Sequence, residues 1–204
     1  MSSGIDTVVF DLGNVLIPWN IHNVLGDYFD SEEAVSAFLT EIDFAGWHAR
    51  QDAGYPVAQA VAEHSAKFPH HAHVITAFYA RWNETVGPVI EESAQMLASL
   101  RAAGLRCYAL SNFSAELFAQ SKPRYDFWSH FEGIVLSGEE GVNKPDARIY
   151  QVLFERHAID PARAVFIDDS LPNVLASRAL GMRAVHFRAP GEARLALRGF
   201  GLPV

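Results

Sequence analysis

A chain of 204 residues, half of them hydrophobic and a fifth charged, is long enough for one ordinary domain or for a core domain with a smaller insertion. This composition excludes a mini-protein and a disordered chain. The formal net charge of −8 repels the phosphate backbone of nucleic acid and anionic membrane surfaces, so we expect neither as a partner.

The single cysteine and the apolar runs bear on the compartment. Cys107 has no second cysteine with which to form an intramolecular disulfide, and it lies within an apolar run, which predicts a core position. No run approaches the roughly 18 apolar residues of a membrane helix, and the first residues do not resemble a signal peptide. We expect a cytoplasmic protein, monomeric or homodimeric, without a membrane segment.

The first predicted element is a short strand at residues 7–10, and a long helical stretch follows it. The next strand begins near Leu105, which is far beyond the usual crossover between parallel strands. Amphipathic helical patterns occupy residues 32–39, 57–67 and 74–82 within this gap. We therefore expect an inserted helical cap over residues 18–86 and a core made of residues 1–17 and 87–204.

Helices and apolar strands alternate after the insertion. Helical spacing predicts helices over residues 89–100 and around 149–154, Asp160 with Pro161 resembles a helix start, and Pro172 and Gly181 bracket a further helix. Continuous apolar runs predict strands at residues 105–110, 133–137, 164–167 and 184–187. Such strands are typical of a parallel sheet covered on both faces. The predicted fold class is α/β, with a Rossmann-like parallel sheet flanked by helices.

Polar residues follow several of these strands directly. Asp11 ends the first strand, Ser111 and Asn112 end the second, and Asp168 and Asp169 end the fourth, while Lys144 follows the third. Because ligands of open parallel sheets bind beyond the carboxyl ends of the strands, we expect these side chains in one crevice.

Three carboxylates in one crevice repel one another unless cations compensate. Lys144 and a divalent metal are the candidates. Oxygen ligands with neither cysteine nor paired histidine favour Mg²⁺ over zinc, and Mg²⁺ is usually bound together with a substrate phosphate. The sequence thus indicates a Mg²⁺ site, and this metal in turn indicates a phosphate group on the ligand.

Four segments resemble, in order, the motifs of the haloacid dehalogenase-like (HAD) hydrolases, and the resemblance runs from about residue 7 to 202. They are VVFDLGNVL at residues 8–16, ALSN at 109–112, KPD at 144–146 and FIDD at 166–169. The insertion lies where this family carries its first type of cap. Residues 10–16 are similar to bacterial sugar-1-phosphate phosphatases, and Asp168 and Asp169 with Asn173 are similar to the phosphatase domain of bifunctional epoxide hydrolases.

The resemblance implies a role for each matching residue. Asp11 would be the nucleophile that forms an aspartyl phosphate, and Lys144 would neutralise both nucleophile and phosphate. Ser111 and the backbone near Asn112 would donate hydrogen bonds to the phosphoryl oxygens. The metal ligands implied are Asp11, the carbonyl of Gly13, Asp168 and Asp169. Asn173 would orient Lys144 or the metal shell.

The sequence departs from the family at Gly13. Phosphatases of this family usually carry there a second aspartate, which acts as general acid and base. Glycine has no side chain to carry a proton, and this puts efficient turnover of poor leaving groups in doubt. His22, nearby in the sequence, is a substitute candidate, because histidine is the residue type best suited to proton exchange at physiological pH.

Several residues of the insertion admit two interpretations. Trp19, Trp47, His48 and Trp82 either line a substrate pocket or form the core of the cap, and the core interpretation is favoured because aromatic residues of small bundles are mostly core. For His70, His71 and His73, a solvated surface is favoured over a metal cluster.

Three functions remain open. The first is a Mg²⁺-dependent phosphomonoester hydrolase, which by resemblance acts on a sugar phosphate. The second is a 2-haloacid dehalogenase, which needs no acid at Gly13 but is disfavoured by the negative charge of Asp168 and Asp169. The third, motivated by Gly13, is a catalytically impaired protein that binds a phosphate ligand.

Overall fold

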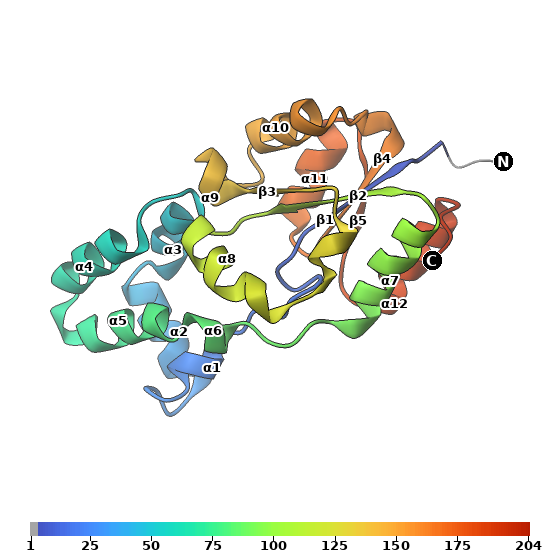
Figure 1. The fold of residues 1–204 in the computed structure, drawn as a ribbon. Coiled ribbons are helices and arrows are strands. Elements are labelled where there is room, and N and C mark those ends of the chain that lie inside the picture. Colours follow the sequence, from blue (N-terminus) through green and yellow to red (C-terminus); the bar gives the residue numbers. More distant parts are fainter. Residues whose placement is uncertain (1–3) are drawn as a thin grey trace.

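The computed structural model describes residues 4–204 as a parallel β-sheet covered by helices, with a helical insertion beside it (Figure 1). The sheet has five strands in the order β3-β2-β1-β4-β5, and all neighbouring strands are parallel. They are β1 (Thr7–Phe10), β2 (Arg106–Ser111), β3 (Gly133–Leu136), β4 (Ala164–Asp168) and β5 (Arg183–His186). Every boundary lies within one residue of the predicted one, so the α/β fold class is confirmed.

Helices make up most of the remaining chain. The insertion contains α1 (His22–Leu25), α2 (Glu32–Glu41), α3 (Phe44–Asp52), α4 (Val57–Lys67), η1 (Pro69–His71), α5 (Ala72–Ala80) and α6 (Trp82–Thr85). Around the sheet lie α7 (Glu91–Ala102), α8 (Ala115–Ser121), η2 (Lys122–Arg124), η3 (Phe127–His130), α9 (Ser137–Glu140), α10 (Ala147–His157), η4 (Pro161–Arg163), α11 (Leu171–Ala179) and α12 (Pro190–Gly199). Within residues 4–204, no helix has the length and apolar character needed to cross a membrane.

The predicted helix start at Asp160 and Pro161 begins a 3₁₀ helix and not an α-helix. Asp160 does accept a hydrogen bond from the backbone N–H of Ala162, as an N-cap would, but only the 3₁₀ turn η4 follows it. The turn ends after three residues because the chain enters β4 at Ala164.

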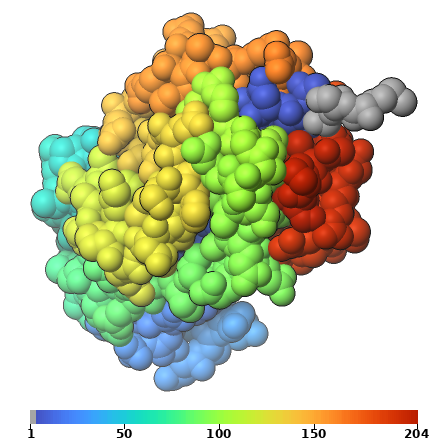
Figure 2. Space-filling view, turned by 45° about the vertical axis from the view of Figure 1, so that its right-hand side comes forward, coloured from blue at the N-terminus to red at the C-terminus, as the bar shows by residue number. Residues whose placement is uncertain are grey.

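Alternate residues of each strand enter different hydrophobic clusters on the two faces of the sheet. Val8 and Phe10 of β1 belong to the cluster that contains α7 and α12, whereas Val9 belongs to the cluster that contains α10 and α11. Figure 2 shows the first face, where α7 (green) lies between the C-terminal α12 (red) and the yellow segment that precedes β3. Burial on both faces explains why the strands are continuously apolar.

The register of the sheet brings the strand ends to one edge. Phe10 of β1 lies opposite Ala109 of β2 and Ile167 of β4. Asp11, which follows Phe10, is therefore level with the end of β4 at Asp168. This alignment places the polar residues that follow three strands beside one another.

The insertion leaves and re-enters the core at neighbouring points of the chain. Trp19 and Val86 form an antiparallel bridge. On either side of it, the Asn20 N–H donates to the carbonyl of Thr85 (2.8 Å), and the Gly87 N–H donates to the carbonyl of Pro18 (2.9 Å). We call residues 18–86, between these crossings, the cap.

Helix α3 docks the cap onto the core. The Ser137 hydroxyl donates to the carbonyl of Asp52 (2.5 Å), and the Asn143 side-chain amide donates to the carbonyl of Ala49 (2.7 Å). Just beyond the helix, Gly54 approaches so closely that a Cβ on it would lie 2.7 Å from the Gly138 carbonyl oxygen. These contacts fix the side of α3 that faces the strand ends.

Candidate active site

Asp11 lies at the end of β1 and is 7% exposed. The chain turns directly after it, and its Oδ1 accepts a hydrogen bond from the backbone N–H of Leu12 (2.7 Å). Its own N–H donates to the carbonyl of Ile167 (2.8 Å), which ties it to β4. The carboxylate is thereby held in one orientation at the sheet edge.

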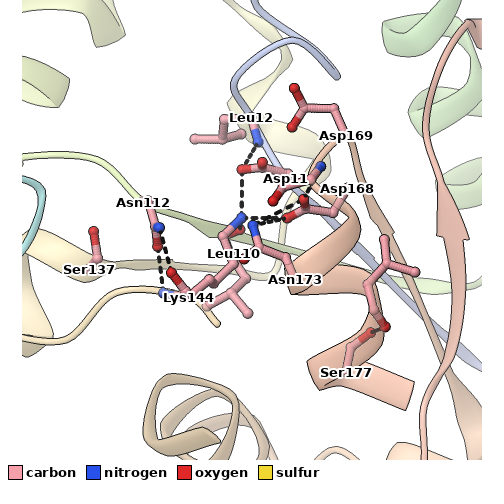
Figure 3. A network of polar contacts seen from close by, with 12 residues as sticks. Asp11, Leu12, Leu110, Asn112, Ser137, Lys144, Asp168, Asp169, Asn173 and Ser177 are labelled. Carbon is pink, nitrogen blue, oxygen red and sulfur yellow. Dashed lines mark hydrogen bonds and ion pairs between the residues drawn. The ribbon is translucent and has the colours of Figure 1, made fainter. Parts of the chain in front are cut away.

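Lys144 lies between two carboxylates (Figure 3). Its Nζ lies 2.9 Å from Asp11 Oδ1 and 2.7 Å from Asp168 Oδ2, and it donates to the carbonyl of Leu110 (2.9 Å). Although burial lowers the pKa of Lys144, the carboxylates of Asp11 and Asp168 raise it more, so its pKa lies above the ordinary value. The lysine therefore stays charged although it is buried.

Asn112 positions Lys144 through the backbone. The Lys144 N–H donates to Asn112 Oδ1 (2.7 Å), and Asn112 Nδ2 donates to the Lys144 carbonyl (2.9 Å). This side chain is consequently engaged in holding the lysine loop. Ser111, the last residue of β2, is 2% exposed and lines the cavity described below.

Asp168 is fully buried and has several donors. Its Oδ1 accepts from the Ser170 N–H (2.8 Å), and Asn173 Nδ2 lies 3.1 Å from Oδ1 and 3.2 Å from Oδ2. Asn173 thus contacts the carboxylate that pairs with Lys144, and it positions the lysine indirectly, through Asp168.

Asp11, Asp168 and Asp169 form a carboxylate group whose oxygen atoms lie within 4.8 Å of one another. Burial raises the pKa of Asp11 to about 7; Lys144 opposes the shift, whereas Asp168 and Asp169 add to it. The geometry creates an excess of negative charge that one lysine does not neutralise, and a divalent cation would relieve it.

The turn after Asp11 supplies a contact that sequence reasoning missed. Gly13 lines the cavity beside Asp11. Asn14 has a left-handed backbone (φ 55°), donates through Nδ2 to Asp169 Oδ2 (3.1 Å) and accepts at Oδ1 from the Trp19 N–H (3.0 Å). An asparagine in a turn gives a weak signal in sequence, because it equally suits the turn alone.

His22 is not brought to the site. It begins α1, whose buried residues are Val24 and Leu25, so the histidine lies exposed on the solvent side of that helix. Its proximity to Asp11 in the sequence is therefore no guide to its place in the fold.

A cavity of about 270 Å³ opens between the strand ends and the cap. Its core side is formed by Asp11, Leu12, Gly13, Asn14, Ser111, Asn112, Phe113, Lys144, Asp169 and Asn173. Its other side is formed by Ile17, which directly precedes the cap, and by Trp19, His48, Asp52, Trp82 and Val86 of the cap. This side is largely apolar, with His48 and Asp52 as its titratable groups.

The favoured interpretation of the cap aromatics as core was wrong for two of them and incomplete for a third. Trp19 and His48 line the cavity, and Trp82 lines it while being only 3% exposed. Trp47 does belong to the core, where its Nε1 donates to the carbonyl of Ala60 (3.2 Å). Asp52 was not singled out at all, because an acidic residue at a helix end has no distinctive pattern.

The histidines of the cap surface lie away from this cavity. His70 Nε2 lies 2.7 Å from Glu41 Oε1, and His71 Nε2 lies 3.1 Å from Glu41 Oε2. His70 is exposed, as predicted for a solvated surface, whereas His71 packs edge-on against Phe38.

Comparison with known proteins agrees with this geometry. A family model described as haloacid dehalogenase-like hydrolase matches residues 5–181. The chain is 25% identical over 186 residues to the sesquiterpene phosphatase astK of Aspergillus oryzae, covering 91% of each protein. It is 28% identical over 204 residues to the drimenol cyclase drtB of Aspergillus calidoustus. This match includes 96% of the present chain and 37% of drtB.

A solved structure shows the same fold. A HAD family enzyme of Bacteroides thetaiotaomicron superposes with a TM-score of 0.73 at 26% identity, covering 91% of this chain and 95% of that one. The same enzyme in complex with magnesium and inorganic phosphate gives a TM-score of 0.69 at 25% identity with the same coverage. The match of the family model over most of the sequence shows that the chain belongs to the haloacid dehalogenase-like hydrolases.

Proposed function

We propose that this chain is a Mg²⁺-dependent phosphomonoester hydrolase that acts through a covalent phosphate on Asp11. The observation that carries the proposal is the position of Lys144 Nζ, 2.9 Å from Asp11 Oδ1 and 2.7 Å from Asp168 Oδ2. A buried carboxylate held by a fixed cation at the edge of a cavity suits nucleophilic attack on a phosphate ester.

The carboxylate group fits Mg²⁺. Asp11, Asp168 and Asp169 offer hard oxygen ligands within 4.8 Å of one another, and Lys144 compensates only part of their charge. We assign the Gly13 carbonyl, in the cavity wall, as a further ligand. When bound, the ion would neutralise charge on the substrate phosphate. The magnesium and phosphate complex of the Bacteroides enzyme supports this choice.

The reaction proposed has two halves. A carboxylate oxygen of Asp11 attacks phosphorus, and the bond from phosphorus to the leaving alcohol breaks. Water then attacks phosphorus, which frees phosphate and Asp11. Lys144 would favour the ionised form of Asp11 and stabilise charge on the phosphoryl group, while Ser111 and the backbone N–H groups near Asn112 would donate to its oxygens.

The substrate class proposed is a small phosphorylated metabolite, with a sugar phosphate preferred. A cavity of about 270 Å³ admits a small molecule. The partly buried ring of Trp19 in its wall can pack against the apolar face of a sugar ring.

The test is phosphate release from p-nitrophenyl phosphate and from a panel of glucose 1-phosphate, glycerol 3-phosphate, phosphoserine and farnesyl monophosphate. Each is assayed with Mg²⁺ and with EDTA. We expect release to require Mg²⁺ and to fall about 10³-fold or more in Asp11→Asn. Asp30→Asn, at an exposed position before α2, serves as the matched control and should retain activity.

Two results would redirect the assignment. Release of halide from 2-chloropropionate without metal would indicate a dehalogenase. It would also show that the negative charge of Asp168 and Asp169 does not prevent that reaction. Absence of both activities, together with measurable binding of inorganic phosphate, would indicate a binding protein.

A further inference from the structure

The proposed reaction leaves one chemical requirement without a residue. When an alkyl phosphate is cleaved, the leaving oxygen needs a proton, and Gly13 has no side chain to provide it. Of the titratable side chains that line the cavity in the described part of the chain, Asp11, Lys144 and Asp169 are engaged in the carboxylate group and its lysine. His48 and Asp52 of the cap remain.

We infer that His48, paired with Asp52, is the general acid and base of this site, donating from Nε2 to the leaving oxygen; the inference rests on the proposed phosphatase function. The proton donor would thus come from the cap, on the opposite side of the cavity from the nucleophile. His48 and Asp52 lie one helical turn apart on α3, with side chains 12% and 16% exposed.

The hydrogen bonds around His48 select its tautomer. The Tyr79 hydroxyl donates to Gln51 Oε1, which can only accept, so the Tyr79 oxygen is left to accept from His48 Nδ1–H at 2.8 Å. Burial raises the pKa of Tyr79, which keeps that hydroxyl protonated. Nε2 is then the titrating nitrogen, 3.8 Å from Asp52 Oδ2, and both residues line the cavity.

The imidazole is held rigidly. It stacks between Trp19 and Phe44, with centroid distances of 5.3 Å and interplanar angles of 9° and 10° respectively. The ring centroid of Trp82 lies 5.8 Å from that of His48. A ring clamped in this way presents Nε2 in one direction, which proton transfer requires.

The surroundings bring the two pKa values toward each other. Burial lowers the pKa of His48, opposed by Asp52, and burial raises the pKa of Asp52, opposed by His48, the Ser114 N–H and Lys144. Burial thus disfavours the charged form of each partner, so the two pKa values lie closer together than those of the free side chains.

The proton follows a closed cycle. As the bond from phosphorus to the leaving oxygen breaks, that oxygen takes the proton from Nε2 of charged His48 and departs as the alcohol. Neutral His48 keeps its Nδ1–H on Tyr79. When water attacks phosphorus, Nε2 accepts a proton from it, phosphate leaves, and the starting charge of His48 returns.

Leaving-group dependence tests this role. In His48→Gln, we expect kcat/KM for glycerol 3-phosphate to fall about 10²-fold or more, and that for p-nitrophenyl phosphate to fall far less, because p-nitrophenolate departs without a proton. Asp52→Asn should show the same selectivity more weakly. His22→Gln, at an exposed histidine of the same cap, is the matched control and should change neither value.

A restored carboxylate supplies a readout that misfolding would not give. A Cβ at Gly13 would meet no atom of residues 4–204 within 4 Å, so the backbone there has room for the Cβ of an introduced aspartate. In the His48→Gln background, Gly13→Asp should recover turnover of glycerol 3-phosphate. Equal losses on both substrates, or no recovery, would overturn the role of His48. An inactive wild type would instead overturn the proposed function itself.

Discussion

Lys144 is a buried cation whose charge is matched by Asp11 and Asp168. Breaking a buried ion pair from one side leaves uncompensated charge in a low dielectric. We expect Lys144→Met to destabilise the metal-free protein by about 3–5 kcal/mol in urea unfolding. The control is Arg163→Met, which removes the exposed pair with Asp6 and should cost under about 1 kcal/mol. Equal losses in the two variants would contradict the burial argument.

Single residues also show where sequence reasoning succeeds. Asp11, Ser111 and Asp168 stand at the ends of apolar runs, and the register of a parallel sheet dictates that such ends meet. The hydrogen bonds between the Asn112 side chain and Lys144 could not be predicted from the sequence. They join positions 32 residues apart through the backbone groups of Lys144, which any residue type there would offer.

At the level of elements, the fit of α3 onto the core depends on Gly54. Its φ is +87°, and a Cβ there would lie 2.7 Å from the backbone carbonyl of Gly138. Gly104, after α7, has a φ of +86° but an added Cβ would meet no atom within 4 Å in the described chain. A side chain would therefore strain the backbone at both positions, but only at Gly54 would it also clash with a neighbouring atom.

Gly54→Ala should consequently cost more than Gly104→Ala, for which the left-handed backbone alone predicts about 1–2 kcal/mol. We also expect Gly54→Ala, but not Gly104→Ala, to reduce kcat, because the clash at Gly54 would displace the helix that carries His48. Urea unfolding and steady-state kinetics of both variants provide the measurement. Identical behaviour would show that α3 adjusts freely.

The strands could be predicted from the sequence, but the face of α3 that lines the cavity could not. Burial on both faces leaves a continuous apolar run that marks a strand whatever lies around it. His48 and Asp52 are four residues apart and so share a helix face, but that face is defined by contacts with Ser137, Asn143 and Gly138, far along the chain. No local pattern encodes such an orientation.

For the whole molecule, the pKa of Asp11 links stability to pH. Its folded value of about 7 exceeds the ordinary 3.8, so the folded state binds this proton more tightly. The corresponding stabilisation is complete below about pH 4 and is lost as the pH rises through 7. In EDTA, Asp11→Asn should therefore raise Tm by a few degrees at pH 8 relative to the wild type.

That gain should shrink as the pH falls toward 4, and Asp30→Asn should show no such trend. Thermal unfolding at pH 5 and pH 8 is sufficient to compare the three proteins. A variant that is less stable than the wild type at pH 8 would mean that the pairing of Asp11 with Lys144 outweighs its burial.

The bridge between Trp19 and Val86 has a consequence for how this molecule can diverge. Because the chain enters and leaves the cap through hydrogen-bonded neighbours, the insertion is a loop with its ends already joined, and its length matters little to β1 or α7. Asp11, Lys144, Asp168 and Asp169 all lie outside residues 18–86. Evolution can therefore exchange the half of the cavity that we propose contacts the leaving group while retaining the half that we propose holds phosphate.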